Sequence, residues 1–161
     1  MGEPKGSPLL IGTWQPQPLL EINKMPCKDI TDHLRIRLDA NDRITRYALR
    51  KLSCGGAVGN QSLIIDWLEN KTAEEVLNAN AADVLDSHNV TDEIEEYLLL
   101  KHFLAVRAGL SIMLGRESGS VENYCKLEAI RCSPQGTEII AHIAVEGMTD
   151  EIQACGRCGK H

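Results

Sequence analysis

Two strands joined by a polar turn are the feature that most constrains the fold of this chain. Residues 33–38 alternate between basic side chains (His, Arg, Arg) and aliphatic ones (Leu, Ile, Leu). This period of two predicts a half-buried strand from His33 to Leu38. Residues 39–42, Asp-Ala-Asn-Asp, have turn chemistry, and an apolar run predicts a second strand from Ile44 to Leu52. Together they predict an antiparallel hairpin.

Cys54 directly follows the second predicted strand, and glycines at positions 55, 56 and 59 separate it from a helix predicted over Asn60–Leu68. Glycine leaves little bulk over a neighbouring thiol, and the amides at a helix start lower a thiol pKa. Two interpretations stay open. Cys54 is either an accessible, reactive or ligating thiol, or a small buried hydrophobe in a tight turn.

The predicted hairpin brings a second thiol toward Cys54. Cys27 and Asp29 lie just before the first strand, and the start of one hairpin strand meets the end of the other. Two thiols and a carboxylate are therefore expected at the same open end. Thiolates are soft ligands for zinc, Cu(I) and iron–sulfur clusters, and a carboxylate makes such a site weaker and exchangeable.

Length and charge exclude several classes of protein. The 161 residues, 43% of them hydrophobic, predict one domain, or one domain with a small appendage. A net charge of −6 argues against a general nucleic-acid binder. No apolar run reaches the roughly 18 residues of a membrane span, and the N-terminus does not read as a signal peptide. We therefore expect a cytoplasmic protein whose six cysteines are thiols or metal ligands.

Composition divides the chain into four segments. Residues 1–26 contain five prolines and predict an extended arm. Residues 27–115 are expected to form the main α+β domain, and the serine- and glycine-containing residues 116–123 a linker. Residues 124–161 then predict a hairpin, with strands at Tyr124–Cys132 and Thr137–Val145, followed by a short helix capped at Thr149 and a Cys-x2-Cys tail.

The helices are expected to lie between the two hairpins. Thr72 and Glu75 form a capping box that opens a short helix, and another turn or two is expected over Ala81–Leu85. The longest helix is expected to open at Thr91 and its acidic neighbours and to end near Gly115. Between Asp66 and Glu96 there are ten acidic residues and one lysine. These residues form either a solvated face of the protein or a face that docks a partner. The predicted fold is α+β, a small antiparallel sheet with helices packed on one face.

The central part of the chain resembles the iron–sulfur cluster assembly scaffolds of the IscU type, or the NifU N-terminal domain. The resemblance covers about 90 residues, from Cys27 to about Leu114. The matching features are Cys27-x-Asp29, the strand His33–Leu38, Cys54-Gly55-Gly56-Ala57, Ser62-Leu63-Ile64-x-x-Trp67-Leu68 and Lys71-Thr72-Ala73-Glu74-Glu75-Val76.

The resemblance implies a fold, a function and partners. A cysteine desulfurase would deliver persulfide sulfur. A labile cluster, expected as 2Fe–2S, would assemble from this sulfur and iron, and an apo-protein would then receive the cluster. Cys27 and Cys54 would be ligands, and Asp29 would keep the cluster labile. No cysteine occurs between Cys54 and Cys125, where the family has its third. His102 is the nearest candidate, as the family's histidine or as a replacement ligand; its other interpretation is a partly buried helix histidine.

A second cysteine group lies outside the resemblance. Cys155 and Cys158 form a Cys-x2-Cys pair, which suits a metal or redox site, or else they are two free thiols on a tail. Cys125 and Cys132 are the other members of the group. Being seven residues apart, they would face opposite sides of a regular strand, so four-cysteine ligation requires a bulge.

Three functions follow from these observations. The first is an iron–sulfur scaffold or carrier without enzymatic turnover, alone, as a homo-oligomer or in a larger complex. The second is a scaffold-derived interaction module that holds zinc or no metal. The third is a thiol-dependent sulfur-transfer enzyme that uses Cys54 or the Cys155/Cys158 pair as persulfide carrier.

Overall fold

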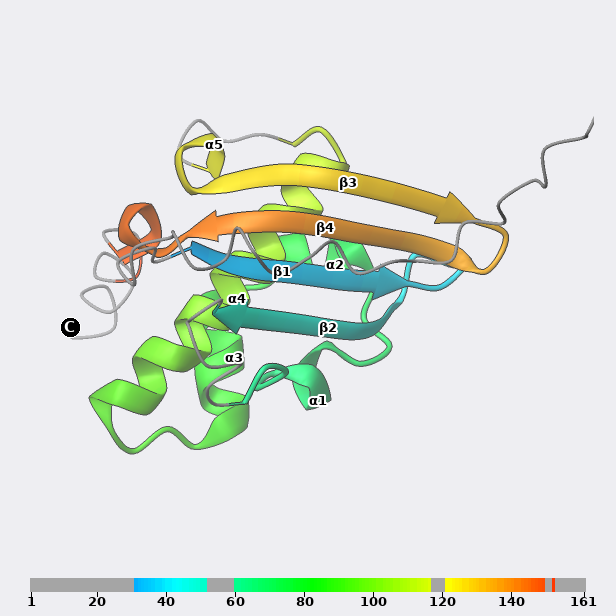
Figure 1. Ribbon diagram of the computed structural model, residues 1–161. Coiled ribbons are helices and arrows are strands. Elements are labelled where there is room, and N and C mark those ends of the chain that lie inside the picture. Colours follow the sequence, from blue (N-terminus) through cyan, green and yellow to red (C-terminus); the bar gives the residue numbers. More distant parts are fainter. Residues whose placement is uncertain (1–30, 52–59, 117–120, 150–151, 153–161) are drawn as a thin grey trace, which may run out of the picture.

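The structure is a four-stranded antiparallel sheet with helices on one side (Figure 1). The computed structural model describes residues 31–51, 60–116, 121–149 and 152, so the predicted proline-rich arm and the Cys-x2-Cys tail lie outside the described residues. The elements are β1 (Thr31–Leu38), β2 (Ile44–Lys51), α1 (Ile65–Leu68), α2 (Ala73–Asn78), α3 (Ala81–His88), α4 (Glu93–Met113), α5 (Val121–Tyr124), β3 (Cys125–Ser133) and β4 (Gly136–Ala144).

Two hairpins build the sheet, in the strand order β2-β1-β4-β3. The first, β1–β2, confirms the hairpin predicted around residues 39–42. The second, β3–β4, turns through Pro134 and Gln135, with Ser133 opposite Gly136. Gly136 has a φ of +140°, and a Cβ there would lie 1.9 Å from the carbonyl oxygen of Leu38, so this turn requires glycine. Because β4 also pairs with β1 along its whole length, the C-terminal hairpin joins the same sheet as the first.

The two faces of the sheet differ in chemistry. The aliphatic residues of β1 point toward the helices and are fully buried together with Tyr47, Ile139, Ala141 and Ile143. The opposite, outer face is basic, and its Arg and Lys residues, placed there by the strand register, are Arg35, Arg37, Arg46, Arg50, Lys126 and Arg131. The acid Glu138 of β4 forms ion pairs with three of these arginines.

Helix α4 is the main support of the sheet, and it contacts all four strands. It begins after Asp92, whose carboxylate accepts hydrogen bonds from the amides of Ile94 and Glu95, so the N-cap is Asp92 and not Thr91. Gly109 lets the helix approach β1 closely, because a Cβ there would lie 2.8 Å from a methyl group of Leu34. No helix among the described residues is long and apolar enough to cross a membrane.

The shorter helices agree in part with the sequence. The capping box of Thr72 and Glu75 is present at the start of α2, as predicted. Helix α1 is shorter than the predicted Asn60–Leu68, because the chain before it is bound to the edge of β2. There the carbonyl of Gln61 accepts from the amide of Leu49, and the hydroxyl of Ser62 donates to the carbonyl of Tyr47.

Two elements of the C-terminal part begin at residues other than those that the sequence predicted. Tyr124 ends α5 and β3 begins at Cys125, so the strand begins one residue later than the sequence predicted. A helix begins at residue 145, directly after β4, and residue 152 is also helical, whereas the sequence predicted a helix capped at Thr149. The Thr149 hydroxyl instead donates back to the carbonyl of Val145, as a residue inside a helical turn does.

Candidate functional site

The strand ends that lead to the predicted thiol site meet at one end of the sheet. Asp32, the second residue of β1, lies opposite Lys51, the last residue of β2. Cys27, Asp29 and Cys54 lie outside the described residues. In the sequence, Cys27 is four residues before Thr31 and Cys54 is three residues after Lys51, so the chain connects both cysteines to neighbouring strand ends.

A buried carboxylate lies at this end of the sheet. Asp32 is 1% exposed, and its Oδ2 lies 2.5 Å from Nζ of Lys101 on α4. Its Oδ1 is buried and has no hydrogen-bond partner, the one such side-chain atom among the described residues. A buried carboxylate oxygen without a donor or cation is costly. The sequence indicated that Asp32 is buried, because inward-facing residues of β1 alternate and Asp32 is two residues before the inward-facing Leu34.

His102, the replacement ligand considered from the sequence, is held in a buried hydrogen-bond chain. It is 6% exposed, and its Nδ1 lies 2.9 Å from the hydroxyl of Tyr47. That hydroxyl also accepts from the amide of Ile64, at 2.8 Å. Burial, aided by the charge of Lys101, lowers the pKa of His102 to about 4, and burial raises the pKa of Tyr47. At neutral pH both groups are therefore neutral, and they share one hydrogen bond whose direction depends on the imidazole tautomer.

The hydrogen bond to Tyr47 limits how His102 can bind a metal. Nε2 would be the ligand atom, since Nδ1 is occupied by Tyr47. Ligation through Nε2 requires the imidazole proton to be on Nδ1, which then donates to the Tyr47 oxygen.

Cys125 and Cys132 lie in β3 but far from each other. A bulge between Leu127 and Ala129 puts both on the helix-facing side, opposite Ile143 and Thr137. The strand length still separates them by roughly 20 Å, whereas two thiolates on one zinc ion are about 4 Å apart. Cys125 is buried, which raises its pKa to about 11, and Cys132 is exposed. These two cysteines therefore do not share a metal ion; Cys155 and Cys158 lie outside the described residues.

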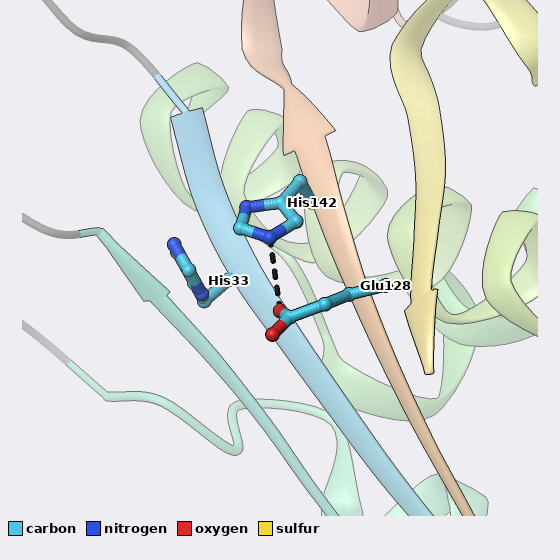
Figure 2. Close-up of side chains that lie close together, drawn as sticks. All are labelled: His33, Glu128 and His142. Atoms are coloured by element: carbon cyan, nitrogen blue, oxygen red, sulfur yellow. Dashed lines mark ion pairs between the residues drawn. The ribbon is translucent and has the colours of Figure 1, made fainter. Parts of the chain in front are cut away.

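The structure brings together three further side chains that the sequence did not single out. His33 of β1, Glu128 of β3 and His142 of β4 converge on the outer face (Figure 2). One potential ligand atom from each lies within 4.8 Å of the other two. His142 Nε2 is 2.9 Å from Glu128 Oε2, and the His33 and His142 rings are 4.1 Å apart at 71°. Alternation in the sequence put His33 on the outer face, but only strand pairing brings His142 and Glu128 to it.

The chain is similar to a curated protein over part of its length. It is 32% identical over 63 residues to the iron–sulfur cluster assembly scaffold protein IscU of Buchnera aphidicola subsp. Baizongia pistaciae (strain Bp). The match covers 37% of this chain and 49% of that protein, so the chain spans about half the length of the curated relative. No family model matches the chain. No solved structure matches it either. The similarity supports an IscU-like relationship over these 63 residues.

Proposed function

We propose that this protein is a scaffold or carrier that binds iron or a labile iron–sulfur cluster as its cargo, through Cys27, Asp29 and Cys54. The observation that carries the proposal is the junction of Asp32 with Lys51, because in the sequence Cys27 shortly precedes one of these strand ends and Cys54 shortly follows the other. The similarity to an IscU scaffold over 63 residues supports the same function.

The residues near these strand ends suit a cationic cargo. Two thiolates are soft ligands for iron, and a carboxylate is a harder ligand that exchanges more readily. Asp32 adds a buried, anionic oxygen that has no donor. In this proposal Cys27 and Cys54 hold the iron and Asp29 keeps the site exchangeable. Asp32, which is paired with Lys101 through Oδ2, offers its unpaired Oδ1 from the helix side. His102 would complete the ligand set through Nε2.

The proposed partners are a cysteine desulfurase, as the source of sulfur, and an apo-protein that receives the cluster. Persulfide labelling by mass spectrometry tests the first of them. After incubation with desulfurase and cysteine, we expect one added sulfur atom on Cys54 or Cys27. Unmodified thiols would count against sulfur delivery.

Anaerobic reconstitution with ferrous iron and sulfide tests the function itself. We expect visible cluster absorption that Cys27→Ala and Cys54→Ala abolish. Cys132→Ala is the matched control, because this thiol is exposed and lies near the opposite end of the sheet. His102→Gln should lower the cluster content. Absorption that survives both cysteine substitutions would contradict the proposed site.

A specific observation also favours the second candidate, a scaffold-derived module that binds zinc or no metal. The chain has no cysteine between Cys54 and Cys125, and His102 is engaged with Tyr47. If the protein stays colourless in the reconstitution and binds zinc that Cys27→Ala and Cys54→Ala release, the scaffold proposal fails and the module is supported.

A further inference from the structure

We propose that His33, Glu128 and His142 form a binding site for a divalent transition-metal ion, of the zinc class, on the outer face of the sheet. This site contains no thiol and uses none of the residues assigned to the iron–sulfur cargo. It is therefore a further binding function, independent of the one proposed above.

The strand register fixes the three positions. His33 and His142 are direct cross-strand partners in the β1–β4 pair, at the centre of the sheet. Lys126 occupies the β3 position opposite His142, so a regular β3 would not offer a carboxylate there. The bulge between Leu127 and Ala129 inserts Glu128 as an extra residue, and its carboxylate reaches His142 Nε2 at 2.9 Å. The three side chains thus come from three strands, on backbone that the sheet holds rigid.

The distances require only small side-chain movements for ligation. In a tetrahedral zinc site with bonds of about 2.0–2.1 Å, ligand atoms are roughly 3.3 Å apart. Here all three atoms already lie within 4.8 Å of one another, and the closest pair is at 2.9 Å. Side-chain rotations alone can make up the difference. The cross-strand ion pair of His142 with Glu128 would then be replaced by bonds from both to the metal.

The donor set selects the class of ion. Two imidazoles and one carboxylate suit zinc and the other first-row divalent ions, whereas magnesium and calcium prefer oxygen ligands alone. Three protein ligands leave at least one coordination position for water. The side chains of His142 and Glu128 are 37% and 51% exposed, so solvent and ions can reach the site.

The neighbouring charges make Glu128 the critical ligand. Arg50 lies opposite His33 and Lys126 opposite His142, and both disfavour a cation. Glu138, the other acid that the described strands place on this face, is bound to three arginines. Glu128 therefore supplies the negative charge that a divalent ion needs, and we expect Glu128→Gln to weaken binding by at least about 10-fold.

The experiment separates this site from every thiol site. In the full chain, Cys27→Ala, Cys54→Ala, Cys155→Ala and Cys158→Ala are combined, and circular dichroism checks the fold. Cobalt(II) is titrated as the probe and read by visible absorption, with zinc measured by calorimetry. We expect one equivalent of cobalt, with d–d bands and without thiolate-to-cobalt charge transfer. His33→Gln or His142→Gln should weaken binding by at least about 10-fold.

His88→Gln is the matched control, since its Nδ1 bonds within α3, to Ser87 and to the carbonyl of Val84, and we expect it to leave binding unchanged. The proposal is overturned if the variant without the four cysteines binds no cobalt. It is also overturned if that variant binds cobalt equally well after His33→Gln and His142→Gln are added together. His142 and Glu128 would then form only an ion pair. If that variant does not fold, NMR of the wild-type imidazoles during zinc titration decides. Among the five histidines, His33 and His142 must then shift together.

Discussion

Tyr47 and His102 are joined by a hydrogen bond of 2.9 Å that ties strand β2 to helix α4. The Tyr47 hydroxyl also accepts from the backbone amide of Ile64, so one oxygen connects the sheet, the long helix and the start of α1. Both side chains are buried, and water cannot replace either bond when it is lost. The hydrogen bond between His102 and Tyr47 therefore contributes mainly to the stability of the fold.

Removal of the Tyr47 hydroxyl should destabilise the fold. In Tyr47→Phe the amide of Ile64 loses its acceptor and Nδ1 of His102 loses its hydrogen-bond partner, which should lower the free energy of unfolding by about 2–4 kcal/mol. Urea denaturation measures this change. Tyr97→Phe, on a partly exposed position of α4, is the control and should change it by less than about 0.5 kcal/mol. Equal effects of the two substitutions would show that the buried hydroxyl has no special role.

Acid should destabilise the protein through His102. Its folded-state pKa of about 4 lies below the ordinary value of 6.5, because burial disfavours the charged imidazole. Between these two pH values the unfolded chain binds more protons than the folded one. The stabilising contribution is thus complete above pH 6.5 and is lost as the pH falls toward 4, by up to about 3 kcal/mol.

The measurement for this prediction is urea unfolding at several pH values, in the wild type and in His102→Gln. Carboxylates titrate in the same range in both proteins, so the difference between the two curves isolates the imidazole. We expect the wild type to lose more stability than the variant between pH 6.5 and 4. Parallel curves would contradict the prediction.

The buried pair of Asp32 and Lys101 should be sensitive to the loss of one partner. Lys101→Met leaves the Asp32 carboxylate buried without its cation, and such a change typically costs about 3–5 kcal/mol. Adding Asp32→Leu removes the stranded charge, so the double variant should be more stable than Lys101→Met alone. Thermal and urea unfolding at pH 7 measure both. A cost below about 1 kcal/mol for Lys101→Met would indicate that another cation already neutralises Asp32.

The two thiols of β3 should react at very different rates. Cys125 is 3% exposed with a pKa raised to about 11, whereas Cys132 is exposed. At pH 8, iodoacetamide should therefore alkylate Cys132 readily and Cys125 only after unfolding, because the thiolate is the nucleophile. Peptide mass spectrometry over time, with and without urea, measures the two rates. Similar rates in the native protein would show that the start of β3 opens easily.

Local patterns predicted much of the secondary structure. Alternation of side chains predicted β1 and β2, and the side-chain chemistry of Thr72 and Glu75 predicted the start of α2. These features depend on neighbours within a few residues. The predicted helix over Asn60–Leu68 was too long because residues 61 and 62 bond to β2, which is a contact between segments that local propensity does not include.

The sequence by itself determined the α+β composition, the two hairpins and the similarity to IscU scaffolds, because period, turn chemistry and motif spacing are local properties. Tertiary structure alone decided which residues meet. The pairing of β1 with β4 brings His33 to His142, the bulge in β3 adds Glu128, and the packing of α4 places His102 on Tyr47 and Lys101 on Asp32. Residues as far apart in sequence as His33 and His142 become neighbours through strand register, which depends on the whole sheet.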